Sequence, residues 1–190
     1  LADPGQPHLD GCPFVRESRM IFCSIRQGNA REIDLYTATR RGGQWTDWRN
    51  WGEPFNTTYQ VGEMHISADG RLLYFSSDRP GGYGGRDLWV SQHVDGQWQE
   101  PVNLGPTVNT AGDENRPFVT ADGQELWFDG VSRQGLPGPA TFRALRQPDG
   151  SWSAPEEIVA SFAGEPTLTG DGRTLYFVHH YFDLDTGQPI

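Results

Sequence analysis

The chain has 190 residues and a formal net charge of −10, with 15 basic against 25 acidic residues. This charge argues against binding nucleic acid through its phosphates. No apolar run approaches the roughly 18–20 residues that a membrane-spanning helix needs, so we expect no transmembrane segment. Frequent Gly and Pro, together with 12% aromatic residues, are typical of many short strands joined by turns.

Two cysteines, Cys12 and Cys23, flank the first predicted hairpin. Its strands are expected over residues 12–15 and 20–25, with a turn near Glu17, so the two cysteines lie opposite each other. A strained cross-strand disulfide and a pair of small buried thiols fit this arrangement equally well. The positions of the cysteines in the sequence therefore predict neither their redox state nor the cellular compartment of the protein.

A unit of about 53 residues then repeats along the chain. ADGRLLYF (68–75) returns as ADGQELWF (121–128) and as GDGRTLYF (170–177). Tryptophans recur at nearly the same interval, and these are Trp45, Trp98 and Trp152. A period of this size, with several short strands per unit, is the signature of a propeller or a related array.

The second unit shows the predicted order of strands best. A strand with a polar lead-in covers 62–67, and an Asp-Gly turn leads to an aromatic strand over 72–77. A Gly-rich loop over 77–87 precedes a third strand over 87–93. A second Gly turn then leads into Trp98 and an outer strand, which makes four strands, the content of one propeller blade.

The predicted fold class is therefore all-β, a β-propeller of four-stranded antiparallel blades with three full blades and a partial fourth. The whole chain, 1–190, is one domain, and its approximate blades are 10–62, 63–112, 113–163, and 164–190 with 1–9. Residues 1–9 either complete the fourth blade and close a small ring, or the chain is a fragment of a five- or six-bladed propeller. The second reading is favoured because nine residues are too few for two missing strands. An open blade edge would also allow dimerisation.

Three motifs within 66–128 resemble the WD-like β-propeller repeat family. They are x-Asp-Gly-x-x-Leu-Tyr-Phe, Ser-Asp-Arg-Pro-Gly-Gly-x-Gly-Gly-x-Asp-Leu-Trp and Gly-x-Trp-x-x-Pro-x-Asn-Leu-Gly. Relatives in this family include the propeller domain of the periplasmic TolB protein and modules of outer-membrane lipoproteins. The resemblance implies an exported bacterial protein, periplasmic or extracellular, that binds a protein or an envelope glycan. It implies no universal catalytic residue and no cofactor.

The first strand of each propeller blade lines the central channel, and its lead-in residues lie near the channel mouth. Aligned across the blades, the candidate ligand-binding residues are Asp10, Glu63, His65, Asp113, Glu114, Arg116 and Glu165. As a site they would form a polar funnel for a cation, a sugar or a basic peptide. As a repeated cap they would only satisfy backbone amides, and their recurrence from blade to blade favours this second interpretation.

The predicted function is a non-catalytic binding or scaffold module of the bacterial envelope, with a glycan-processing enzyme as the alternative. Paired carboxylates hydrolyse glycosides, and Glu63, Glu114 and Glu165 would then be catalytic. Three aromatics, Trp48, Trp51 and Tyr59, are candidates for sugar stacking, although burial in the blades is favoured.

No metal site is predicted. His179 and His180 are adjacent on a strand and point to opposite faces. The run Asp183, Asp185, Gly187 lacks the later glutamate of a calcium loop. Recurring loop residues are assigned structural roles, and these are Asp34, Asp78, Arg79 and Asp87.

Overall fold

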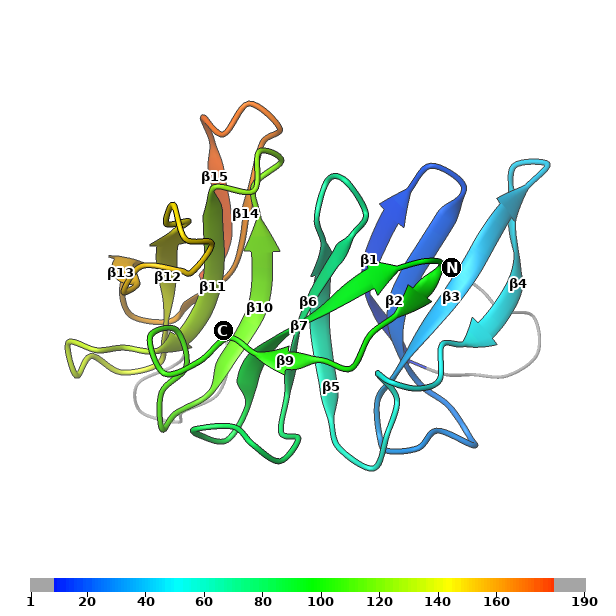
Figure 1. Cartoon of the computed structure of the whole chain (residues 1–190), viewed down its shortest axis with the longest axis horizontal. Helices are drawn as coiled ribbons and strands as arrows, with labels where there is room; N and C mark the ends of the chain where they lie inside the picture. The colour runs from blue at the N-terminus through cyan, green and yellow to red at the C-terminus, as the bar shows by residue number, and fades with distance from the viewer. Residues whose placement is uncertain (1–8, 180–190) are drawn as a thin grey trace.

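The computed structural model describes residues 9–179, and every regular element in this range is a β-strand. The strands form four sheets that lie side by side in chain order (Figure 1). The first sheet contains β1 (Leu9–Arg16), β2 (Arg19–Ile25), β3 (Asp34–Arg41) and β4 (Gln44–Asn50). The second contains β5 (Val61–Ile66), β6 (Leu72–Ser77), β7 (Asp87–Val94), β8 (Gln97–Trp98) and β9 (Val102–Asn103).

The third sheet contains β10 (Glu114–Val119), β11 (Glu125–Val131), β12 (Pro139–Leu145) and β13 (Glu156–Val159). The fourth has two described strands, β14 (Ala163–Leu168) and β15 (Leu175–His179). All neighbouring strands pair antiparallel. The predicted all-β propeller of antiparallel blades, with a partial fourth, is confirmed. Predictions on residues 1–8 and 180–190, including the calcium-like run and the completion of the fourth blade, lie outside the described residues.

The predicted first hairpin is also confirmed, with β1 and β2 joined at Glu17-Ser18. No helix long and apolar enough to cross a membrane occurs between residues 9 and 179.

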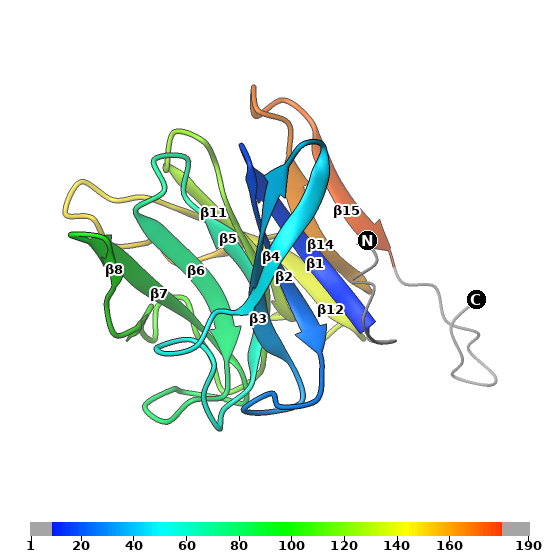
Figure 2. The ribbon, with the colours of Figure 1, turned by 90° about the vertical axis from the view of Figure 1, so that its right-hand side faces the viewer.

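The sheets pack face to face because alternate residues of each second strand point to opposite faces. Phe75 on β6 belongs to the apolar cluster shared with the first sheet, whereas its neighbour Tyr74 belongs to the cluster shared with the third. The equivalent strand of the fourth sheet, β15, lies at the edge of the described array (Figure 2). Its Tyr176 is 59% exposed, whereas the equivalent Trp127 of β11 is 5% exposed.

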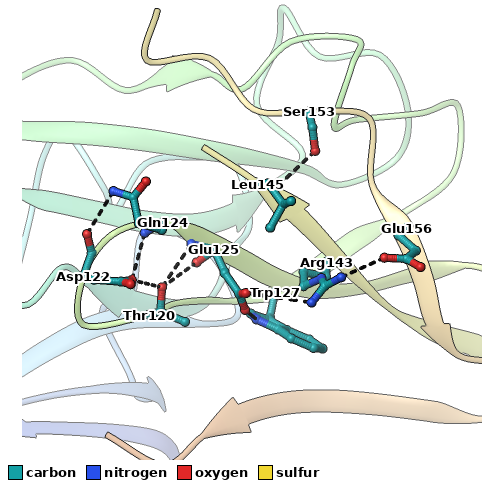
Figure 3. Close-up of polar contacts among 9 residues, drawn as sticks. All are labelled: Thr120, Asp122, Gln124, Glu125, Trp127, Arg143, Leu145, Ser153 and Glu156. Carbon is teal, nitrogen blue, oxygen red and sulfur yellow. Dashed lines mark hydrogen bonds and ion pairs between the residues drawn. The ribbon is translucent and has the colours of Figure 1, made fainter. Parts of the chain in front are cut away.

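The repeated Asp-Gly motif folds into the same hydrogen-bonded turn in three sheets. In the third sheet, Thr120 Oγ1 donates to Asp122 Oδ1 at 2.6 Å, and the backbone N–H of Gln124 donates to the same oxygen at 3.0 Å (Figure 3). Asp69 and Asp171 accept equivalent bonds in their own turns. These bonds stabilise the carboxylate form and lower the pKa of all three aspartates. The motif therefore shapes a turn.

A second repeated device anchors the third strands. Asn109, 2% exposed, accepts a hydrogen bond from the Leu88 N–H at 2.8 Å and donates to the Leu88 carbonyl at 3.0 Å. It also donates to Asn103, whose own amide donates to Asp87 at 2.7 Å. The first sheet repeats this chain of contacts with Asn56, Leu35, Asn50 and Asp34. These contacts support the structural roles assigned to Asp34 and Asp87.

Replacing Asn109 with alanine is expected to lower the free energy of unfolding by about 2 kcal/mol, because the buried N–H and carbonyl of Leu88 both lose their partner. Urea unfolding of the full chain measures this loss. Asn115→Ala is the matched control, because the Asn115 side chain accepts one long contact of 3.4 Å from Arg86. Equal stabilities of the two variants would contradict the anchoring role.

Candidate functional site at the inner-strand groove

The inner strands β1, β5, β10 and β14 share a bulge that turns one side chain toward a common groove. Each register shifts at the same place in the strand. The residues at this position are Cys12, Glu63, Arg116 and Glu165. Three of them have φ between 52° and 56°, in the left-handed region that residues other than glycine seldom occupy. Such strain concentrates at functional sites, and here it directs the side chains.

All four bulge residues line a cavity of about 620 Å³ that extends from β1 to β14. A second cavity of about 590 Å³ continues toward the Asp-Gly turns. The two share a waist of three rings, in which His65 lies 5.3 Å from Phe14 and 4.6 Å from Phe118 between ring centroids. The inner strands thus form one long groove with a polar mouth and an aromatic waist.

Arg116 is the centre of the polar mouth. Its Nη1 lies 3.0 Å from Asp129 Oδ2, and its Nε lies 3.4 Å from Glu63 Oε1 and 3.6 Å from Glu165 Oε1. The sheets contribute one or two residues each, with Glu63 on β5, Arg116 and Asp129 on β10 and β11, and Glu165 on β14. The structure therefore brings together three of the predicted residues, and a fourth group, Asp129, joins them.

Asp129 forms the floor of this cluster. It is 2% exposed, and besides Arg116 it accepts a hydrogen bond from the backbone N–H of Glu165 at 3.3 Å. Burial raises the pKa of Asp129 to about 6, although Arg116 and the Glu165 N–H act in the opposite direction. At neutral pH the mouth therefore holds three carboxylates and one guanidinium, an excess of negative charge.

His65 is enclosed by the two phenylalanine rings at the waist. Burial lowers its pKa to about 4, while a hydrogen bond with the Val119 backbone acts in the opposite direction. The imidazole is consequently neutral at physiological pH, and it serves as a flat, partly polar wall of the groove.

The other three predicted residues do not line this groove. Asp10 and Glu114 occupy equivalent positions before the bulge, where Asp10 pairs with Arg26 at 3.1 Å. Contrary to its predicted place at the channel mouth, Glu114 is 2% exposed and accepts hydrogen bonds from the Thr110 N–H and hydroxyl. Its pKa is raised by burial. Asp113 accepts a hydrogen bond from the backbone N–H of Arg86 at 2.8 Å, so its carboxylate caps the loop.

The aromatics considered for sugar stacking pack mainly within the blades. Trp48 stands edge-on to Phe22 at 5.4 Å, and Trp51 packs on Phe55 at 4.6 Å. Tyr59 is 39% exposed on a loop and is not among the groove residues. Both tryptophans are half-buried, so burial, the interpretation favoured for this set, describes them in part.

Cys12 and Asp129 are site residues that the sequence reasoning missed. A signal was present for the first, because three of the four bulge residues precede a proline, in Cys12-Pro13, Arg116-Pro117 and Glu165-Pro166. Asp129 replaces Ser76 of the second sheet at the equivalent position facing the bulge. A charged residue in place of a small one, on an otherwise apolar strand, was the signal for it.

Radially arranged antiparallel sheets whose first strands line a common groove define a β-propeller architecture. Among solved structures, TolB from Acinetobacter baumannii superposes with a TM-score of 0.60 at 15% identity, over 87% of this chain and 36% of that one. A putative TolB from Agrobacterium tumefaciens superposes with a TM-score of 0.58 at 20% identity, over 92% of this chain and 59% of that one. The resemblance to TolB-like propellers is thereby confirmed at the level of the fold.

The structure of an enzyme is similar too. A puromycin-hydrolyzing peptidase of Mycobacterium tuberculosis superposes with a TM-score of 0.54 at 18% identity, over 92% of this chain and 27% of that one. This chain spans less than two thirds of the length of each of these three proteins. No protein-family model matches the sequence, and no curated protein sequence does. Because propellers carry unrelated activities, function has to be argued from the groove.

Proposed function

We propose that this chain is a non-catalytic binding module that holds a segment of a partner protein in its inner-strand groove. The observation that carries the proposal is the charge at the mouth, where Glu63, Glu165 and Asp129 surround the guanidinium of Arg116. A lysine or arginine side chain of the partner would complete this cluster, because Glu165 is 48% exposed and free to turn toward it. The chain's net charge of −10 would favour the approach of a basic segment.

The aromatic waist supports a peptide as the occupant. Phe14 and Phe118, with the neutral His65 between them, offer apolar ring surface below the charged mouth. A basic residue followed by an apolar one would meet both surfaces in order. A neutral glycan would gain little from the unbalanced carboxylates, so a protein partner is preferred to a glycan.

The alternative of a glycoside hydrolase has less support. Such an enzyme needs one carboxylic acid that stays protonated and a second carboxylate across the bond. Glu63 and Glu165 both lie within 3.6 Å of the same Arg116 nitrogen, so this cation contacts both carboxyl groups. The carboxyl with a pKa of about 6, Asp129, is buried beneath Arg116. The third proposed catalytic residue, Glu114, is bonded to Thr110 away from the groove.

Location in the bacterial envelope, periplasmic or extracellular, is part of the same proposal. It rests on the resemblance of the repeat motifs to TolB-like propellers and on the superposition with two TolB structures.

Fluorescence anisotropy with three synthetic peptides of one length, basic, neutral and acidic, tests the proposal. The basic peptide is expected to bind most tightly. Glu165→Gln should weaken it about fivefold, because one partly exposed charge contributes about 1 kcal/mol. The affinity should also fall with added salt. Glu32→Gln is the matched control, because Glu32 is exposed and does not line the groove.

Equal weakening by Glu32→Gln would show that only the net charge matters and would overturn the groove as the site. Binding of envelope oligosaccharides without any peptide binding would replace the protein partner with a glycan. Turnover of aryl glycosides that is lost in Glu63→Gln would overturn the non-catalytic assignment.

A further inference from the structure

The first sheet carries two thiols where the third sheet carries an ion pair. Cys12 is the bulge residue of β1 and is equivalent to Arg116 of β10. Cys23 on β2 pairs with Gly11 and is equivalent to Asp129 of β11. Since Arg116 and Asp129 touch at 3.0 Å, this pair of positions directs two side chains at each other across the strands. In the first sheet it directs one thiol at another.

The two thiols differ in accessibility. Cys23 is 6% exposed, whereas Cys12 is half-buried and lines the 620 Å³ cavity beside Glu63. The hydrogen bond between the thiols, then burial, raises the pKa of Cys23 well above the ordinary value of a cysteine. A reagent that enters the groove therefore reaches Cys12 first, and the buried Cys23 lies next to Cys12 and can react in a second step.

We propose that Cys12 and Cys23 form a thiol–disulfide exchange site, which takes a small aliphatic disulfide as its oxidant. Cys12 releases its proton, and its thiolate attacks one sulfur of that disulfide; the S–S bond of the reagent breaks, a mixed disulfide forms, and the expelled thiolate takes up the released proton. The Cys23 sulfur, as its proton departs, then attacks Cys12 Sγ and expels the second thiol. The chain loses two protons and two electrons in total, and the oxidant takes them up and is reduced to two thiols. The product is a disulfide between β1 and β2 at the lip of the groove.

The site does not depend on the proposed peptide binding, because it needs only the two strands of one hairpin. Its position beside Glu63 and Arg116 nevertheless places the first step inside the groove. The mixed disulfide would therefore occupy the polar mouth.

Oxidised glutathione, added to the reduced full chain, tests the proposal. Thiol titration and mass spectrometry should show loss of both thiols and of two hydrogens, and a non-reducing digest should contain one linked peptide pair with Cys12 and Cys23. In Cys23→Ser, glutathione should remain attached to Cys12. Without urea, Cys23 of the Cys12→Ser variant should react with glutathione disulfide at least about tenfold more slowly than Cys12 of the native chain. In urea, where both thiols are exposed, the two should react equally fast.

One outcome with the wild-type chain alone would overturn the proposal. Both thiols would remain in the folded chain under the same oxidised glutathione that converts them to a disulfide in urea. Glutathione stably attached to both cysteines of the wild-type chain would also overturn it. So would a disulfide that forms only between chains and depends on protein concentration.

Discussion

Replacing His65 with phenylalanine is expected to remove a destabilising contribution of about 3 kcal/mol that develops on acidification. Burial between Phe14 and Phe118 lowers the pKa of His65 from 6.5 to about 4 in the folded chain. Below about pH 6.5 the unfolded chain takes up a proton that the folded chain does not accept. Acidification therefore favours unfolding until the pH reaches the folded-state pKa of about 4.

Urea unfolding across this range of pH, for the wild type and His65→Phe, measures the contribution of His65. The variant should gain stability relative to the wild type as the pH falls, and the difference should level off near about pH 4. Phenylalanine keeps three aromatic rings in contact at the waist, so the comparison at neutral pH reports mainly the lost contact with Val119. Parallel pH profiles for the two proteins would show that His65 is solvated.

The repeated parts of this fold could be predicted because the same residue types recur wherever the backbone makes the same turn or needs the same hydrogen bonds. Asp122 recurs as Asp69 and Asp171, since each tight turn needs the same two hydrogen bonds. Asn109 recurs as Asn56 for the same reason. Each device is local, so the spacing of its residues is visible in the chain and predicts the strands around it.

The site could be predicted only in part because its geometry depends on how separate blades meet. Position at the start of inner strands was enough to select Glu63, Arg116 and Glu165. Their convergence on one guanidinium comes from the packing of three sheets. The bulge adds one residue to each inner strand, and this reverses which neighbours face the groove. A strict alternation places Glu114 and Arg116 on the same face, whereas in the structure Arg116 lines the groove and Glu114 is buried outside it.

Asp129 should act on stability in the sense opposite to His65. Its pKa rises from 3.8 to about 6 on folding, mainly through burial. Between these values the folded chain binds a proton that the unfolded chain releases, so stability increases as the pH falls. The shift corresponds to about 3 kcal/mol, present below about pH 4 and lost as the pH rises through 6. Glu114, whose pKa is also raised, contributes in the same direction.

In Asp129→Asn this gain on acidification is expected to disappear, because the amide keeps the shape of the neutral acid and does not titrate. The His65 contribution would then be opposed by Glu114 but no longer by Asp129, and the variant should lose up to about 3 kcal/mol between neutral pH and about pH 4. The wild type, in which the two groups offset each other, should show a much flatter profile. Turn aspartates such as Asp122, whose pKa is lowered, lose their bonds only at still lower pH and leave this window unaffected.

Urea unfolding of the wild type, Asp129→Asn, His65→Phe and the double variant forms a closed thermodynamic cycle. Since the two side chains lie on different sheets, β5 and β11, their pH-dependent contributions should add to within about 0.5 kcal/mol. A steep acid loss in Asp129→Asn alone, restored by His65→Phe, is the expected pattern. If Asp129→Asn keeps the flat profile of the wild type, Asp129 is already ionised in acid, and Arg116 outweighs its burial. The groove mouth would then be held by a strong ion pair instead of a carboxylate poised to accept a proton.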